Sequence, residues 1–185
     1  MRKLASGLFM TMDGVAEAPN IWQETFDEDM GAAMQGMMEE TDTVLLGRVT
    51  YQEWEPYWTS DNVSADNAGF ARFINTTPKY VVSRTLKDTP WGTFNNAQLV
   101  KNLKEDITNL KAQPGKTITV TGSPTLVNSL LQEDLLDELT LTIHNVAAYK
   151  GKPLFGQGNL KRFDLVDVKA SRTGVILATY QTRKP

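Results

Sequence analysis

Apolar residues recur along the chain in two spacings, and these spacings predict strands and helices in alternation. Short apolar runs with little alternation, such as Val44-Leu45-Leu46 and Tyr80-Val81-Val82, are typical of central strands covered on both faces. The turn sequence Ser171-Arg172-Thr173-Gly174 separates the last two runs, so we expect these runs to form an antiparallel hairpin. The expected strands span residues 3–12, 43–46, 79–83, 117–121, 139–146, 164–170 and 175–182.

The segments between these strands show helical spacings. Thr25 and Glu28 have the spacing of a capping box, and Met or Ala at positions 30, 33, 34 and 37 continues as one apolar stripe. A second helix is expected over 97–111, where Leu or Ile recurs on one face. A third helix is expected to open at Ser123-Pro124, with serine as N-cap and proline at the first helical position. The stretch 59–70, rich in Ser, Asn and Asp, is expected to be a long loop.

The order of these elements predicts an α/β fold. Its central sheet is expected to be mixed but mostly parallel, flanked by helices, with an antiparallel C-terminal hairpin. A length of 185 residues suits one full-sized domain and is short for two. We therefore expect residues 1–185 to form a single domain.

Composition and charge argue against several classes of protein. A net charge of −3 disfavours a general nucleic-acid binder, which normally carries a basic surplus. With no cysteine and one histidine, His144, the chain offers no thiolate nucleophile and no zinc constellation, so no metal site is expected. The first apolar run is too short for a signal peptide, and no stretch reaches the ~20 apolar residues of a membrane span. We expect a cytoplasmic protein without a membrane partner.

Suggestive residues follow several of the predicted strands. In an open α/β sheet, ligands bind at the carboxyl ends of the strands. Gly47, Arg48 and Thr50 follow one strand and offer close backbone approach, a guanidinium group and a hydroxyl. Ser83 and Arg84 end the next strand. The remaining strand ends are Asp13-Gly14 and the helix start at Gly122, Ser123, Pro124, Thr125 and Leu126, where free N–H groups favour an anion.

The coincidence of these groups predicts a site for a ligand with several phosphates. A dinucleotide with an extra 2′-phosphate would suit two arginines and one anion-binding helix start at the same sheet edge. The alternative is that each group is an ordinary strand end, with Arg48 a solvated charge and Ser123 only a helix cap. There is no G-x-G-x-x-G after the first strand, so a conventional Rossmann site is not indicated.

Two acids near the first predicted helix are candidates for catalysis. Asp27 and Asp29 border the inward face of that helix, and a carboxyl group in an apolar pocket has a raised pKa and can donate a proton near neutrality. The alternatives are that both acids only complement the helix dipole, or that ordered water supplies the proton.

Aromatic residues near these groups are candidates for the wall of a substrate pocket. Trp22 could face a flat ring or fill the core, and Tyr51 and Trp54 could line a pocket or pack beneath it. His144 lies on the polar face of its strand and is expected to be a structural histidine whose ring nitrogens are satisfied.

Several motifs, taken in order, resemble a known family. They are Thr11-Met12-Asp13-Gly14, Leu46-Gly47-Arg48-Val49-Thr50-Tyr51, Tyr80-Val81-Val82-Ser83-Arg84-Thr85 with Trp91, Val120-Thr121-Gly122-Ser123, the segment 126–139 and Gly151-Lys152-Pro153-Leu154-Phe155. Together they cover nearly the whole chain. The ordered set is similar to the reductase domain of bacterial riboflavin biosynthesis, the C-terminal domain of the bifunctional deaminase–reductase, which has the dihydrofolate-reductase-like fold.

The resemblance implies an NADPH-dependent reductase of a small heterocycle. The leading reaction is one like reduction of 5-amino-6-(5-phosphoribosylamino)uracil. The alternatives are reduction of dihydrofolate or a pterin, non-catalytic binding of a nucleotide or pterin, and a purely structural dimer. The resemblance also implies a homodimer.

The resemblance further implies roles for the residues at the strand ends. Gly47, Arg48 and Thr50 would meet the cofactor phosphates, and Ser83 and Arg84 would lie near the adenosine 2′-phosphate. The segment 122–126 would receive the diphosphate, and Asp13-Gly14 would approach the nicotinamide. The family usually has two glycines where this chain has Gly122-Ser123.

Overall fold

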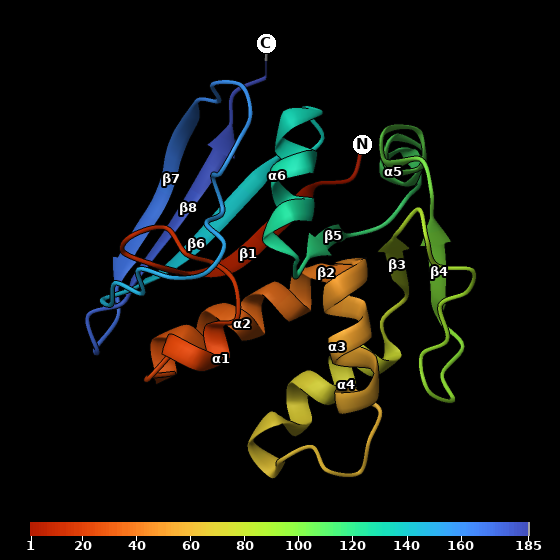
Figure 1. Cartoon of the computed structure of the whole chain (residues 1–185), viewed down its shortest axis with the longest axis horizontal. Coiled ribbons are helices and arrows are strands. Elements are labelled where there is room, and N and C mark those ends of the chain that lie inside the picture. Colours follow the sequence, from red (N-terminus) through yellow and green to blue (C-terminus); the bar gives the residue numbers. More distant parts are fainter. Residues whose placement is uncertain (185) are drawn as a thin grey trace.

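The computed structural model describes residues 1–184, and its strands form one eight-stranded sheet in the order β4-β3-β2-β5-β1-β6-β8-β7 (Figure 1). The six strands from β4 to β6 run parallel, and β8 and β7 are antiparallel additions at one edge. The predicted fold class is therefore confirmed. The strands are β1 Leu4–Thr11, β2 Thr41–Gly47, β3 Lys79–Val82, β4 Ala97–Val100, β5 Thr117–Val120, β6 Glu138–His144, β7 Phe163–Ala170 and β8 Ile176–Thr182.

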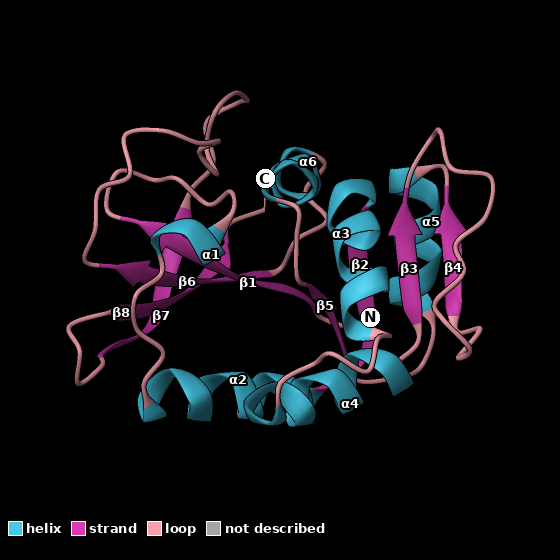
Figure 2. Cartoon of the chain, turned by 60° about the horizontal axis from the view of Figure 1, so that its bottom comes forward, coloured by secondary structure: helices cyan, strands magenta, loops and turns pink. Residues whose placement is uncertain are grey.

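Helices cover both faces of the sheet, as Figure 2 shows. They are α1 Pro19–Trp22, α2 Glu28–Glu40, α3 Arg48–Trp58, α4 Ala68–Thr76, α5 Leu103–Ala112 and α6 Pro124–Gln132, with a short 3₁₀ turn, η1, at Ala65–Asn67.

Two predicted elements differ from the structure. The helix expected over 97–111 begins only at Leu103, because Ala97–Val100 pairs with β3 as an edge strand. The loop expected over 59–70 ends early, because α4 begins at Ala68 and buries Ile74. In both places tertiary contacts decided the structure against the local pattern. Residues 97–100 pair with the free edge of β3, and residues 68–76 form a helix that packs into an apolar cluster.

Successive side chains of each strand point to opposite faces, so the sheet has two different surfaces. We call them the α6 face and the α2 face. On the α6 face, Leu4, Leu8 and Met10 of β1 pack with residues of α5 and α6 in the larger hydrophobic cluster. The α2 face carries Gly7, Phe9 and Thr11 of the same strand.

The hydrophobic cluster on the α2 face covers only part of it. It contains Val44 and Leu46 of β2, Val81 of β3, and residues from α3 and α4. No described residue of β1, β6 or β8 belongs to this cluster. The α2 face therefore has a closed half over β2 and β3 and a second half over β1, β6 and β8 that lacks an apolar cluster.

Candidate functional site

The parallel strands bring the predicted strand-end groups to one edge of the sheet. Gly47 at the end of β2 is in register with Val82 at the end of β3, and Val82 is in register with Val100 of β4. Leu45 and Val120 fix the register of β2 with β5. The residues that follow these strands therefore share one edge, as predicted.

One further strand end was missed by the sequence analysis. Because β4 was taken as part of a helix, Lys101 was not recognised as a cation that directly follows a strand. Lys101 is exposed, and the Ser83 N–H donates to the Val100 carbonyl at 3.0 Å, which places the ends of β3 and β4 side by side.

Two helices begin at adjacent points on this edge. The Gly47 N–H donates to the Gly122 carbonyl at 2.8 Å, and α3 and α6 start one and two residues after these glycines. A Cβ atom on Gly47 would lie 2.8 Å from Ser123 Oγ and 3.0 Å from its backbone nitrogen. Glycine is therefore required at position 47 for the two turns to touch.

The N-termini of α3 and α6 are open to an anion. Within residues 1–184, neither N-cap residue, Gly47 or Ser123, makes a side-chain capping hydrogen bond. The backbone N–H groups of the first turns thus point out with the positive ends of both helix dipoles. Thr50 packs against the second turn, because its Oγ1 lies 3.1 Å from where a Cβ on Gly122 would be. We call this arrangement the double helix-start seat.

The two arginines predicted for this site are exposed to solvent, whereas Ser83 is buried. Arg48 is exposed, and its guanidinium donates to Gln52 Oε1 at 2.8 Å on the same helix. Arg84 is also exposed. Ser83 is buried, and its Oγ accepts the N–H groups of Thr85 and Leu86, so this hydroxyl shapes the turn that presents Arg84.

Asp13 ties the exit of β1 to the segment after β6. Its carboxylate accepts from Thr11 Oγ1 at 2.5 Å and from the N–H groups of Ala148 and Tyr149 at 3.1 and 2.7 Å. The Thr11 hydrogen bond and these backbone N–H groups hold the pKa of Asp13 below its usual value. Gly14, at a φ of 87°, accepts from the Leu154 N–H at 3.0 Å.

Asp27 is the N-cap of α2, and the predicted capping box of Thr25 and Glu28 is wrong. The Asp27 carboxylate accepts from the N–H groups of Asp29 and Met30 at 3.1 Å. It also accepts from the Thr173 Oγ1 and N–H in the β7–β8 turn, at 2.8 and 3.2 Å. Burial raises the pKa of Asp27, but these hydrogen bonds outweigh it and hold the pKa far below its usual value.

Asp29 is likewise engaged with the C-terminal hairpin. Its carboxylate accepts from Lys169 Nζ at 2.5 Å and from the Arg172 N–H at 3.2 Å. The Lys169 hydrogen bond holds the pKa of Asp29 below its usual value. The raised pKa expected for Asp27 and Asp29 is therefore wrong, because partners far away in the sequence stabilise both carboxylates in their charged form.

His144 and Trp22 meet at the end of β6. The Trp22 Nε1–H donates to the Glu17 carbonyl at 3.0 Å, and the Trp22 ring stands edge-on to the His144 ring with centroids 5.5 Å apart. His144 is buried, and its Nε2 has no hydrogen-bond partner among the described residues. The prediction that both ring nitrogens are hydrogen-bonded is therefore wrong for Nε2. Burial lowers the pKa of His144, and the nearby Asp27 charge partly opposes this.

The other aromatic candidates lie in the closed half of the α2 face. Tyr51 is buried in the smaller hydrophobic cluster, and its hydroxyl donates to the Pro90 carbonyl at 2.5 Å. Trp54 packs edge-on against Trp58 and Phe70. These contacts favour the alternative in which both residues pack beneath the site.

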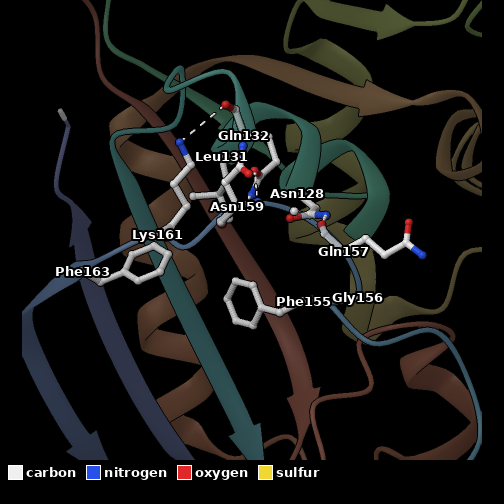
Figure 3. A pocket seen from close by; sticks show the side chains of 10 residues that line it. Asn128, Leu131, Gln132, Phe155, Gly156, Gln157, Asn159, Lys161 and Phe163 are labelled. Carbon is white, nitrogen blue, oxygen red and sulfur yellow. Dashed lines mark hydrogen bonds between the residues drawn. The ribbon is translucent and has the colours of Figure 1, made fainter.

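A cavity of about 400 Å³ lies away from this edge, between α6, the segment 155–161 and the start of β7 (Figure 3). Phe163 in its wall pairs with Thr182, at the end of the hairpin beside the start of β6. Asn128 and Gln132 hydrogen-bond to the backbone of the segment at 2.8 and 2.7 Å. The amide groups of this cavity therefore hold the segment against α6.

Residues 1–184 contain neither a helix able to span a membrane nor a cluster of metal-binding side chains. In that range no helix combines the length and the apolar character that a bilayer span requires. The same residues contain no group of three or more His, Asp or Glu side chains that could hold a metal ion.

Comparisons with known proteins identify relatives of this chain. The model of the family described as the RibD C-terminal domain matches residues 2–177. Over 186 aligned residues, the chain is 30% identical to the uncharacterized protein YyaP of Bacillus subtilis (strain 168), covering 97% of this chain and 94% of that protein. These matches confirm the resemblance drawn from the sequence.

Solved structures share the fold at low sequence identity. A diaminohydroxyphosphoribosylaminopyrimidine deaminase/5-amino-6-(5-phosphoribosylamino)uracil reductase from Thermotoga maritima aligns with a TM-score of 0.71 and 16% identity, over 98% of this chain and 57% of that one. A pyrimidine reductase-like protein from Corynebacterium diphtheriae gives 0.70 and 16%, over 100% and 93%. Dihydrofolate reductase from Enterococcus faecalis complexed with NADP(H) gives 0.64 and 12%, over 98% and 97%.

Proposed function

The chain belongs to the RibD C-terminal domain family, a family of reductase-type oxidoreductases, and on that premise we propose that it is an NADPH-dependent reductase of a small heterocycle. The reaction we favour is like the reduction of 5-amino-6-(5-phosphoribosylamino)uracil. The likeness in fold to proteins named for that reaction and for pyrimidine reduction supports this choice.

The observation that carries the proposal is the double helix-start seat. A diphosphate has two adjacent charged groups, and the seat presents two adjacent helix N-termini, which are ready-made sites for such groups. Gly47 and Gly122 are buried, and Ser123 and Thr50 fill the space beside them, so these glycines bring the two helix starts into contact. Ser123 leaves less space in the seat than the glycine that the family usually has at this position. Its hydroxyl, however, adds a hydrogen-bond donor for a phosphate oxygen.

Charge at the same edge supports a cofactor with a 2′-phosphate. Arg48 follows β2, Arg84 follows β3, and Lys101 follows β4, and all three are exposed. Guanidinium groups bind phosphate in a bidentate manner, and lysine adds a point charge. We propose that these cations bind the adenosine end and that the Asp13-Gly14 turn borders the nicotinamide end.

NADPH supplies a hydride when it is bound, and the chain positions it against an acceptor. Asp27 and Asp29 hold lowered pKa values and are ionised near neutrality, so neither carboxyl carries a proton to donate there. We propose that water donates the proton and that both acids act by holding α2 in place.

We further propose that the protein is a cytoplasmic homodimer. The edge strand β7 exposes Leu165, Val166 and Val168 at 55%, 58% and 54% of their surface. An exposed apolar edge strand is a surface that a second chain can cover. Sedimentation analysis tests this: a monomer at micromolar concentration would contradict it.

Titration of the intrinsic tryptophan fluorescence with NADPH and NADH tests the cofactor assignment. We expect NADPH to bind more tightly than NADH. Arg48→Ala should lower the affinity for NADPH by roughly tenfold or more, because one charge-assisted hydrogen bond contributes about 1.5–3 kcal/mol. Arg162→Ala is the matched control, since Arg162 is an exposed arginine before the start of β7. Equal affinity for both cofactors, or an unchanged NADPH affinity in Arg48→Ala, would contradict the proposal.

The substrate is tested by following NADPH absorbance with 5-amino-6-(5-phosphoribosylamino)uracil and, separately, with dihydrofolate. Faster oxidation with the pyrimidine supports the favoured reaction. Faster oxidation with dihydrofolate would overturn the proposed substrate but not the proposed reductase activity.

A further inference from the structure

Two aromatic rings line one side of the cavity between α6 and the segment 155–161. The rings of Phe155 and Phe163 have centroids 6.2 Å apart, and the end of α6 lies across the cavity from them (Figure 3). Phe155 is 52% exposed and Phe163 is half-buried. Phe163 in turn meets the ring of Tyr180 on β8 at 6.2 Å. Aromatic faces that remain open in this way offer a surface on which a further ring can pack.

Hydrogen bonds fix the opposite wall of the cavity. Gln132 of α6 pairs with the backbone of Asn159: its Oε1 accepts from the Asn159 N–H at 2.7 Å, and its Nε2 donates to the Asn159 carbonyl at 3.4 Å. Asn128 Nδ2 donates to the Gln157 carbonyl at 2.8 Å. Gly158 has a φ of 147°, and a Cβ atom there would collide with the Gln132 side chain, so glycine lets the segment lie this close to α6. The fold therefore holds this wall in one position.

The wall of the cavity carries no free charge. Lys161 is the one charged side chain among the described residues of the wall, and its Nζ donates to Asp134 Oδ1 at 2.6 Å. The rest of the wall consists of the two rings, Leu131 and amide groups. Removing a charged ligand from water is costly unless an opposite charge is free to meet it. An uncharged ligand therefore suits this cavity, in contrast to the double helix-start seat.

The size and the polar groups of the cavity narrow the ligand further. Its volume of about 400 Å³ lies toward the lower end of the range for small-molecule sites, and suits one or two fused rings. Asn159 uses backbone atoms for its contact with α6, so its side-chain amide is left available. An amide both donates and accepts hydrogen bonds, and a heteroaromatic ring has both kinds of partner on its edge.

We propose that this cavity is a second ligand site, which binds an uncharged heteroaromatic molecule of one or two rings. The ring packs on Phe155 and Phe163, and its polar edge meets the Asn159 amide. The cavity lies at the C-terminal end of α6, whereas the double helix-start seat includes the N-terminal end of that helix. The site is independent of the proposed reductase function, because its wall shares no residue with the seat.

A single thiol in the wall tests whether a ring enters the cavity. The chain contains no cysteine, so Gly156→Cys carries one thiol, and a Cβ atom at this position would meet only Pro153 Cγ, at 3.8 Å. The probe is indole, which is uncharged and has two fused rings. We expect saturating indole to slow the reaction of this thiol with a disulfide reagent by about fivefold or more. Gly36→Cys on α2, where a Cβ meets nothing within 4 Å, is the matched control and should change less than about twofold.

Variants of the wall locate the probe, with Gly156→Cys kept as the reporter. Phe155→Ala should raise the indole concentration for half-protection about tenfold, because the ring that packs on the probe is lost. The matched control is Phe94→Ala, an exposed phenylalanine before β4, which should change this concentration less than about twofold. Asn159→Ala should raise it about threefold, through loss of one neutral hydrogen bond. Indole-3-acetate, an anion of similar shape, should require at least about a tenfold higher concentration than indole.

The outcomes separate this site from the proposed function. Absence of protection at Gly156→Cys up to the solubility limit of indole overturns the site, as does equal protection of Gly36→Cys. Half-protection that Phe155→Ala leaves unchanged, or equal protection by indole-3-acetate, also overturns it. NADP⁺ should leave the protection unchanged, and displacement of indole by NADP⁺ would overturn a separate site. Protection by indole in a protein that fails to bind NADP⁺ would overturn the proposed function alone.

Discussion

The two halves of the α2 face belong to the same sheet but are covered differently. Over β2 and β3, the side chains of Val44, Leu46 and Val81 are fully buried beneath α3 and α4. Over β1 and β6, Gly7 is exposed and Phe9 is half-buried. The strand geometry is alike, so the difference lies in the helices above. An apolar cluster covers the closed half, whereas the second half leaves Gly7 exposed.

The two halves are held by different forces. Phe70 and Ile74 of α4 pack directly into the closed half. In contrast, α2 is fixed by its end, through the hydrogen bonds of Asp27 to Thr173 and the ion pair of Asp29 with Lys169. Among the described residues of α2 only Met30 is buried, so this helix adds little apolar cover.

The largest effect is expected from removing an anchor of the closed half. Trp91 is fully buried and its Nε1–H donates to Asn75 Oδ1 at 2.8 Å. Trp91→Ala should lower the free energy of unfolding by about 3–5 kcal/mol, through lost burial and the cavity left behind. Urea denaturation measures this, with the exposed Phe94→Ala as control. A loss below about 1 kcal/mol would mean that the closed half is not the stabilising one.

A smaller, pH-dependent effect is expected at the end of α2. The pKa of Asp27 is lowered in the folded protein, so its contribution to stability is present above the unfolded value of 3.8 and is lost as the pH falls through the folded value. Asp27→Asn should therefore be less stable than the unmodified protein at pH 7, with the difference shrinking below pH 4. Thermal denaturation at pH 7 and pH 3 measures it. An equal difference in stability at both pH values would contradict a stabilising role for the Asp27 charge.

The smallest effect is expected at the open half itself. Gly7→Ala should leave the free energy of unfolding unchanged or raise it by up to about 1 kcal/mol, because alanine loses less backbone entropy on folding than glycine. Gly47→Ala is the contrasting variant and should be destabilising, since its Cβ would meet the Ser123 backbone nitrogen at 3.0 Å. If both alanines destabilise equally, the space over Gly7 is filled in solution.

Much of the fold and the site edge followed from local pattern. The continuous apolar runs of β2 and β3 predicted central parallel strands, and parallel strands share a carboxyl edge. The convergence of Gly47, Ser83 and Gly122 was therefore predictable. The strand β4 was not, because its leucine spacing also suits a helix and only the free edge of β3 selects the strand.

The chemistry of individual side chains was less predictable. Asp27 and Asp29 look like candidate acids in sequence, yet their hydrogen-bond partners come from a hairpin 140 or more residues away. Gly7 sits inside an apolar run that predicts a strand, and the hydrophobic pattern does not predict that it is exposed. A glycine within a strand was the one available signal for it.

The sequence by itself determined the alternation of strands and helices, the shared edge of the parallel strands, and the glycines and arginines that end them. These depend on spacing and on residues adjacent in the chain. Only the tertiary structure decided the lowered pKa of the two aspartates, the contact between two helix starts, and the opening over β1. These depend on which distant segments meet, because burial, charge and free space are properties of neighbours in space.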